Sequence, residues 1–233
     1  MGFNVNNTTF PGPLDLLFPH YCRGCGALGS PLCERCKNNI ILGFSNFCPN
    51  CKDLCPSGTC SKCGLLPPTF VVGNRTDLVG KLAYDLKFHS IRALAEPLAG
   101  ILNEIIPKIG GEVVIVPLPT IRPHIRQRGL DHTLVVAKHF SKIRGDKYRV
   151  VRLLYRNSHA IQVGADRKTR LKQASSAYRI DSSLTIDSNA TYIVFDDIWT
   201  TGASIKAAVR LLKAAGVKKI VVAILAVSRI EEK

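Results

Sequence analysis

The chain of 233 residues is long enough for one well-packed domain with a small additional module. Its composition, 46% hydrophobic and 21% charged, is typical of a globular protein and excludes a fibrous or disordered chain. The net charge of +15 is unusually high and favours an anionic partner, such as nucleic acid, a phosphorylated ligand or an acidic membrane surface.

The N-terminal sequence MGFNVNNTTFPG lacks the basic and apolar regions of a secretory signal. Apolar runs such as IVVAILAV are too short to cross a bilayer, so we expect no membrane span. We therefore expect a cytoplasmic protein. In that compartment, paired cysteines bind metal more often than they form disulfides.

Nine cysteines lie between Cys22 and Cys63, and eight of them form four Cys-x-x-Cys pairs. The sequence predicts a four-cysteine-type zinc-binding module over residues 1–70 and a second domain over residues 71–233. Two pairs complete a closed tetrahedral site, so the predicted zinc is structural and not catalytic. The predicted ligands are Cys22, Cys25, Cys33, Cys36, Cys48, Cys51, Cys60 and Cys63.

The spacing leaves the pairing and the number of ions open. Neighbouring pairs are separated by 7 and 8 residues, and interleaved pairs by 22 and 23. We favour two zinc ions over one. An iron–sulfur cluster is a minor alternative, because the spacing departs from ferredoxin patterns. Cys55 is left over as an expected free thiol, and glycine follows the second cysteine of the first and last pairs, where a left-handed backbone is expected.

Beyond a proline-rich boundary at residues 65–68, apolar residues recur first at helical spacing and then in short continuous runs. Strands that alternate with helices predict an α/β fold with a mainly parallel sheet of about five strands and flanking helices. The predicted elements, in chain order, are helices at 76–88 and 92–107, a strand at 113–119, a helix at 132–143, a strand at 148–155, a loop with a short helix at 156–176, a strand at 192–195, a helix at 203–215 and a strand at 219–227.

The segment YIVFDDIWTTGAS, residues 192–204, joins a buried strand to a helix. Its small residues, hydroxyls and glycine, together with the helix N-terminus, suit a phosphate group. Two adjacent acids would repel that phosphate, but they can accept hydrogen bonds from sugar hydroxyls or hold a divalent cation. The local chemistry therefore predicts a phosphorylated sugar bound by Asp196, Asp197, Thr200, Thr201, Gly202, Ala203 and Ser204.

This segment resembles the phosphoribosyl-pyrophosphate motif of type I phosphoribosyltransferases, and the wider chain resembles the ComF family of competence proteins. The likeness extends to LLFPHYC before the cysteine pairs, LAYDLKFHS, RPHIRQRGLDHT and RNSHAIQVGADRKTRLKQASSAYRI. The resemblance implies a type I phosphoribosyltransferase-like fold preceded by a double zinc ribbon. The chain departs from the family pattern at residues 130–132 and at Ala165, Gln173 and Trp199.

The resemblance also implies the ligands, which are phosphoribosyl pyrophosphate and Mg²⁺. In that family the acid pair binds the ribose hydroxyls and the turn after it binds the 5′-phosphate. Arginine suits the pyrophosphate, because its planar guanidinium donates two parallel hydrogen bonds. Helices within 76–107 are expected to form the acceptor-binding hood, unless this hood is largely absent. The remaining implied substrate-binding residues are Arg126, Arg128, Gly129, Lys87, Gln162 and Arg170.

Two functions fit these predictions. The first is a phosphoribosyltransferase with an unknown nitrogen acceptor, and the second is a non-catalytic protein that senses phosphoribosyl pyrophosphate and binds single-stranded DNA. Either would act in natural transformation, with single-stranded DNA and other DNA-uptake proteins as partners. Residues 122–179 hold fifteen Lys or Arg and three Asp or Glu, as a phosphate-binding surface requires. His124, His132 and His159 are candidate acids or bases, although no catalytic residue is assigned.

Overall fold

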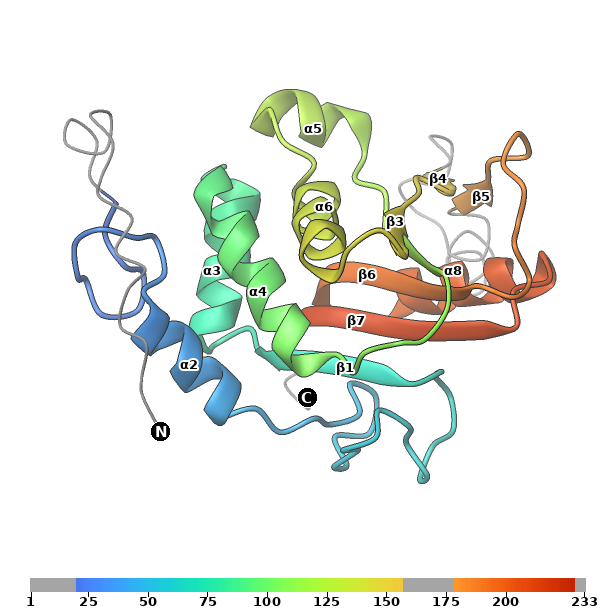
Figure 1. Ribbon diagram of the computed structural model, residues 1–233, viewed down its shortest axis with the longest axis horizontal. Coiled ribbons are helices and arrows are strands. Elements are labelled where there is room, and N and C mark those ends of the chain that lie inside the picture. The colour runs from blue at the N-terminus through green and yellow to red at the C-terminus, as the bar shows by residue number, and fades with distance from the viewer. Residues whose placement is uncertain (1–19, 157–177, 229–233) are drawn as a thin grey trace, which may run out of the picture.

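The computed structural model describes residues 20–156 and 178–228, and Figure 1 shows a central sheet with helices on both faces. The sheet has five strands in the order β1-β7-β6-β2-β3, and every pairing in it is parallel. The predicted parallel α/β fold is confirmed. The strands are β1 Thr69–Asn74, β2 Val113–Pro117, β3 Tyr148–Val150, β6 Thr191–Trp199 and β7 Lys219–Val227.

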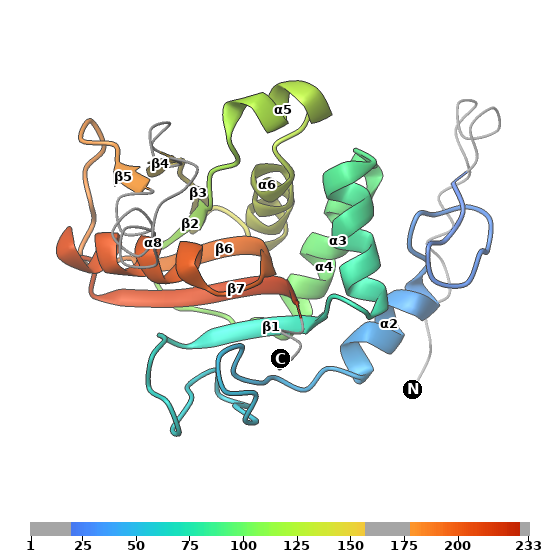
Figure 2. The same cartoon turned by 180° about the vertical axis from the view of Figure 1, so that it is seen from behind.

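Helices cover both faces of the sheet, which explains why its strands are continuously apolar. Along β2, Val113 and Ile115 belong to the cluster built with α3, α4 and α6, whereas Val114 and Val116 belong to the cluster on the α8 side. Figure 2 shows the same two layers from behind. None of the described helices is long and apolar enough to cross a membrane. The helices are α2 Glu34–Leu42, α3 Leu78–Phe88, η1 Arg92–Leu94, α4 Ala95–Ile105, α5 Arg122–Arg128, α6 His132–Arg144 and α8 Ala203–Ala214.

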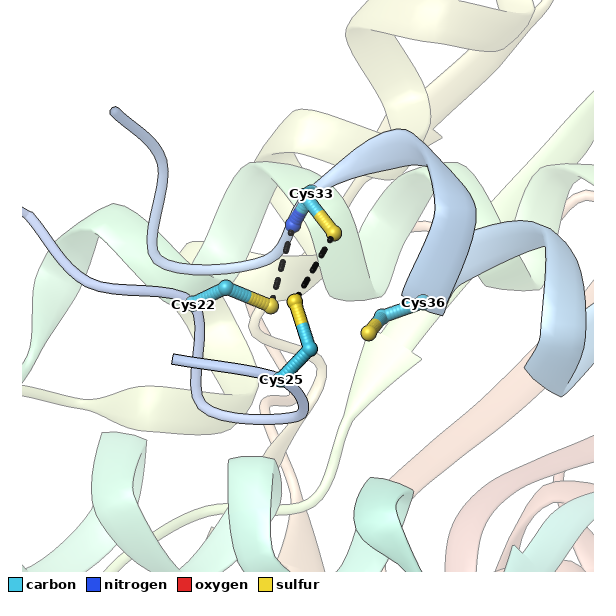
Figure 3. Close-up of side chains that lie close together, drawn as sticks. All are labelled: Cys22, Cys25, Cys33 and Cys36. Carbon is cyan, nitrogen blue, oxygen red and sulfur yellow. Dashed lines mark hydrogen bonds between the residues drawn. The ribbon is translucent and has the colours of Figure 1, made fainter. Parts of the chain in front are cut away.

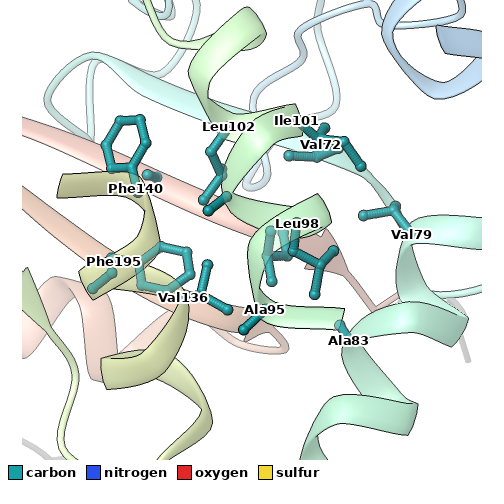
Figure 4. Packing of buried hydrophobic residues seen from close by; sticks show 14 of the residues in the cluster. Val72, Val79, Ala83, Ala95, Leu98, Ile101, Leu102, Val136, Phe140 and Phe195 are labelled. Atoms are coloured by element: carbon teal, nitrogen blue, oxygen red, sulfur yellow. The ribbon is translucent and has the colours of Figure 1, made fainter. Parts of the chain in front are cut away.

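The larger of the two hydrophobic clusters is the one built with α3, α4 and α6, and it fixes α3 and α6 relative to the sheet. Figure 4 shows Leu98 and Leu102 of α4, Val136 and Phe140 of α6, and Phe195 of β6 packed together. Each of these side chains is at most 2% exposed. Full burial of a side chain of this size stabilises the fold by about 1.5–3 kcal/mol. The ends of α3 and α6 that reach the carboxyl edge of the sheet are therefore held on a rigid base.

The chain changes its direction across the sheet between β2 and β6. From β2 it passes through α6 to the outer strand β3, and from β6 it passes through α8 to β7 on the other side. Because α6 and α8 cover opposite faces, a crevice is expected beyond the carboxyl ends of β2 and β6. The pairing of β2 with β6 ends at Phe195, so the rest of β6 extends past that neighbour.

The structure differs from the predicted elements at several places, and neither helix α2 nor the outer strand β1 was predicted. The predicted strand at 148–155 is divided into β3 and β4 (Leu154–Arg156), and β4 pairs with β5 (Tyr178–Ile180) in a separate antiparallel ribbon. The predicted strand at 192–195 continues to Trp199, so the acid pair lies within β6. Helix α5 was not predicted, because RPHIRQR has no apolar periodicity. Nearly all of the segment predicted at 156–176 lies outside the described residues.

The cysteine-rich segment is joined to the outer strand β1 by one buried amide. The Asn46 side chain donates to the carbonyl oxygens of Cys55 at 2.7 Å and Thr69 at 2.9 Å. Its Oδ1 accepts the N–H of Val71 at 3.0 Å. The N–H of Thr69 also donates to the Gly58 carbonyl at 2.8 Å. These bonds cover part of an edge that β1 would otherwise leave unpaired.

Candidate functional site

The eight paired cysteines form two separate sets of four. Within each set, all four sulfur atoms lie within 4.8 Å of one another. Figure 3 shows the four thiols of the first set converging on one small space. Neighbouring pairs therefore combine, and the interleaved pairing does not occur. The sets are Cys22, Cys25, Cys33 and Cys36, and Cys48, Cys51, Cys60 and Cys63, so two structural zinc ions can be held.

The surroundings of the first set suit a cation. The backbone N–H groups of Gly24 and Cys33 each donate to Cys22 Sγ at 3.4 Å. Burial opposes ionisation of Cys22, but backbone donors outweigh it and lower the pKa of this thiol to about 6. Burial and the neighbouring thiols raise the pKa of Cys36 to about 12. Thiols this close ionise together when a cation lies between them, as zinc would.

The glycines after the second cysteine of the first and last pairs have the left-handed backbone that the sequence predicts. Cys55 lies outside both sets of four. Gly26 and Gly64, which follow the second cysteine of the first and last pairs, have φ values of +74° and +56°. Cys55 Sγ donates to the Asp53 carbonyl at 3.3 Å, and burial raises the pKa of the Cys55 thiol. Cys55 is thus a protonated neighbour of the second set and not a ligand in it.

A cavity of about 340 Å³ lies at the carboxyl edge of the sheet, where the crevice between β2 and β6 is expected. It contains residues from the ends of α3, α5 and β6 and from the start of α8. Segments that are far apart in the sequence therefore meet in one space. Six of the predicted substrate-binding residues line it, namely Lys87, Arg128, Asp196, Asp197, Thr200 and Ser204.

Asp197 is held by two basic side chains on its own face of the sheet. Lys87 Nζ donates to Asp197 Oδ2 at 2.7 Å, and His132 Nε2 lies 3.2 Å from the same oxygen. Asp197 is 5% exposed. Burial acts to raise its pKa, but His132 and Lys87 outweigh burial and hold the pKa of Asp197 well below its usual range. Asp197 is therefore an ionised carboxylate in a fixed position.

Asp196 points to the opposite face of β6, because successive residues in a strand alternate. Its Oδ1 accepts the N–H of Asp197 at 2.9 Å. Burial and the negative charge of Asp197 raise the pKa of Asp196 well above its usual range, although Lys87 acts in the other direction. The pKa values of the two adjacent acids are thus shifted in opposite directions, and Asp196 is the one whose ionisation is opposed in the free protein.

The turn after β6 brings Thr200 and Ser204 to the cavity. Gly202, at the start of α8, has a φ of +72°. A Cβ atom at this position would lie 2.0 Å from the ring of Trp199, which is itself buried. Both the left-handed backbone and this contact therefore require glycine. Thr201, Gly202 and Ala203 shape the turn without lining the cavity.

The arginines after β2 are placed by helix α5 and not by the predicted loop. Arg128, the last residue of α5, lines the cavity, whereas Arg126 is exposed and does not. Gly129 ends the helix with a φ of +64° and lies outside the cavity lining. The other two predicted substrate-binding residues, Gln162 and Arg170, lie outside the described residues.

Two arginines that the sequence did not single out add positive charge to the cavity lining. Arg75 follows β1 and Arg156 ends β4, and both line the cavity. His124 lines it too, and burial together with the charges of Arg128, Arg156 and Lys87 lowers the pKa of His124. The position of Arg75 directly after a strand was the signal that could have identified it.

His132, considered above as an acid or base, lies in this site as a partner of Asp197. Its Nε2 faces the carboxylate, and its Nδ1 is buried without a hydrogen-bond partner among the described residues. His132 is the first residue of α6. Its place next to Asp197 puts the start of α6 inside the site.

No protein-family model matches this chain, and no curated protein matches it. Two four-cysteine sets in front of a parallel α/β core, with a polar cavity at the carboxyl ends of its strands, fit a zinc-ribbon and phosphoribosyltransferase-like fold.

Proposed function

We propose that this protein is a ComF-type phosphoribosyltransferase, which binds phosphoribosyl pyrophosphate with Mg²⁺ and acts in DNA uptake during natural transformation. The observation that supports the proposal is the meeting of an acid pair, a hydroxyl-bearing turn and a cationic wall in one cavity. A sugar with two free hydroxyls between two phosphate-bearing ends matches this arrangement, because each ligand group meets complementary side chains.

Each part of the ligand has a place in the proposal. The 5′-phosphate binds at Thr200 and Ser204, beside the N-terminus of α8, where the helix dipole favours an anion. The ribose hydroxyls donate to Asp196 and Asp197. The pyrophosphate lies against Arg128, whose guanidinium can donate two hydrogen bonds. Mg²⁺, when bound, neutralises charge on the pyrophosphate.

The proposed reaction breaks the bond between C1 of the ribose and a pyrophosphate oxygen. The acceptor nitrogen forms a bond to the same carbon and loses a proton to solvent. Positive charge develops on the ribose in the transition state, and the carboxylates of Asp196 and Asp197 stabilise it. Lys87 acts by keeping Asp197 ionised and fixed. The rate enhancement then comes from positioning and electrostatics and requires no general base from the chain.

Release of pyrophosphate tests the proposal. The zinc-loaded protein is incubated with phosphoribosyl pyrophosphate and Mg²⁺, and nucleobases, amines and single-stranded DNA are offered as acceptors. We expect release with at least one acceptor and its loss in the Asp196→Asn, Asp197→Asn variant. Saturable binding without release would identify a sensor instead, and an affinity for single-stranded DNA that falls with salt would support that second function. If neither binding nor release is observed, the proposal that this cavity binds phosphoribosyl pyrophosphate would be refuted.

A further inference from the structure

The guanidinium of Arg128 lies on an aromatic ring at the edge of the cavity. Its central carbon is 4.7 Å from the centroid of the Phe88 ring. This is the geometry of a cation–π contact, which fixes the plane of a guanidinium without using its N–H groups. Arg128 Nη1 is buried and has no hydrogen-bond partner among the described residues. The contact therefore leaves a donor of Arg128 unsatisfied next to a cavity that it lines.

The backbone of Arg128 is fixed by the segment that follows Phe88. Ser90 Oγ donates to the Arg128 carbonyl oxygen at 2.7 Å, and the Arg92 guanidinium donates to the carbonyl oxygen of Gly129. Ser90 has a φ of +55°, which is a strained conformation for a residue other than glycine. The strain persists because the Ser90 hydroxyl is bonded to the end of α5. The loop between α3 and η1 thus holds α5 at its last residue.

Phe88 has no place in the core that would explain a large apolar residue here. Its side chain is 44% exposed, and it ends α3 at the cavity. Tyr84, one turn earlier, is 42% exposed, and the two ring centroids are 4.6 Å apart. Lys87 Nζ also lies 5.7 Å from the Phe88 centroid. The ring therefore contacts two of the cations that line the cavity.

We infer that Phe88 and Ser90 are positioning residues, which hold Arg128 with a free donor directed to the pyrophosphate of the ligand. Phe88 sets the plane of the guanidinium, and Ser90 sets the backbone that carries it. This inference rests on the proposed function, because it names the residues that prepare the pyrophosphate end of the same cavity. It predicts that binding of the 5′-phosphate and binding of the pyrophosphate depend on different residues.

Two smaller ligands allow the two ends of the cavity to be tested separately. Ribose 5-phosphate carries the phosphate expected at Thr200 and Ser204 but lacks the pyrophosphate, whereas inorganic pyrophosphate carries the other end alone. Calorimetric titration of each ligand, and of phosphoribosyl pyrophosphate, is made with Mg²⁺ present. We expect Phe88→Leu to weaken binding of pyrophosphate and of phosphoribosyl pyrophosphate about threefold to tenfold, the loss that one partly exposed cation–π contact supports. Binding of ribose 5-phosphate is expected to stay unchanged.

Matched variants show whether the aromatic ring itself acts. Phe88→Tyr keeps the ring and should restore binding of pyrophosphate. Tyr84→Leu changes an equally exposed aromatic that contacts Phe88 and has no cation–π contact with Arg128, so it should weaken pyrophosphate binding much less than Phe88→Leu. If Arg128 carries the effect, adding Phe88→Leu to Arg128→Ala should cause no further loss. Equal losses for ribose 5-phosphate and pyrophosphate in Phe88→Leu, or a full additional loss in the double variant, would overturn the inference.

Two substitutions at Ser90 separate positioning from stability. Ser90→Ala removes the hydroxyl and keeps the strained φ, so it should lower both the unfolding temperature and the affinity for pyrophosphate. Ser90→Gly removes the hydroxyl and the strain together, so it should recover stability while the affinity stays low. Recovery of affinity in Ser90→Gly would contradict a positioning role. A wild-type protein that binds neither ribose 5-phosphate nor pyrophosphate would instead refute the proposed function on which this inference rests.

Discussion

Two adjacent carboxylates in a buried place repel each other, and this chain relieves the repulsion by giving them different partners. Asp197 accepts from Lys87 and faces His132, so its negative charge is compensated within the protein. Asp196 forms no ion pair with the basic side chains that the structure describes, and its pKa is raised by burial and by Asp197. The free protein therefore holds one compensated charge on Asp197 and one carboxyl group, that of Asp196, whose ionisation is opposed.

We predict that Asp196→Asn and Asp197→Asn change stability at pH 7 in opposite directions. The folded pKa of Asp197 is lowered, so its contribution is present above the unfolded pKa of about 3.9 and is lost as the pH falls through the folded pKa. The folded pKa of Asp196 is raised, so its ionisation opposes folding as the pH rises above the same unfolded value. Asp197→Asn should destabilise by about 3 kcal/mol, because it leaves basic partners uncompensated, and Asp196→Asn should stabilise.

Urea denaturation of both variants, at pH 7 and again near pH 5, measures this difference. The difference in free energy of unfolding between the two variants should be smaller at the lower pH, because Asp196 then has less tendency to ionise in the wild-type protein. If both variants change the free energy of unfolding at pH 7 in the same direction, the opposite pKa shifts assigned to Asp196 and Asp197 would be contradicted.

At the scale of elements, the turn between β6 and α8 depends on one glycine and one aromatic residue. Trp199 ends β6 and is buried, and Gly202 passes over its ring with a positive φ. The turn places Thr200 and Ser204 at the cavity. Its shape is therefore set by packing below it and not by the ligand.

Gly202→Ala is predicted to damage this turn more than a glycine replacement elsewhere. The new Cβ would meet the Trp199 ring at 2.0 Å, in addition to the strain of a positive φ. Gly216→Ala is the matched control, because Gly216 has a φ of +93° and open space around it. Strain of this type costs roughly 1–2 kcal/mol. The free energy of unfolding should therefore fall by that amount in Gly216→Ala and by clearly more in Gly202→Ala. Thermal or urea unfolding compares them, and equal losses would show that the Trp199 contact is unimportant.

The predicted elements were most accurate where periodicity was strong. The apolar spacing of residues 78–86 and 203–212 matched helices α3 and α8 closely, since both bury one side against the sheet. Periodicity could not reveal α5, whose residues are mostly polar, or the break at Val151 that separates β3 from β4. It also could not place the contact of Lys87 with Asp197, because these residues are 110 positions apart and meet through the tertiary fold.

At the scale of the whole molecule, the two four-cysteine sets have different structural relations to the sheet. The first set includes Cys36 of α2, and this helix contacts α4. Arg23, which lies between two cysteines of the same set, forms an ion pair with Asp85 of α3 at 3.3 Å. The second set is joined to β1 through Asn46, and Lys206 of α8 donates to Asn50 at 3.1 Å. Each metal centre can therefore stabilise a different part of the α/β core.

Single cysteine substitutions are predicted to remove zinc ions one at a time. Cys22→Ser and Cys48→Ser each remove a ligand from one set, so each variant should bind one zinc ion per chain in place of two. Cys55→Ser should still bind two, because Cys55 belongs to neither set. Elemental analysis of the purified proteins gives the stoichiometry. Fewer than two ions in Cys55→Ser, or two in Cys22→Ser, would contradict the assignment of ligands.

A crystal structure of the zinc-loaded protein with phosphoribosyl pyrophosphate and Mg²⁺ tests the central claim most directly. The account predicts the 5′-phosphate at Thr200 and Ser204, the ribose hydroxyls on Asp196 and Asp197, and the pyrophosphate within hydrogen-bonding distance of Arg128. A ligand bound elsewhere, or bound in this cavity with its hydroxyls away from the acid pair, would contradict it.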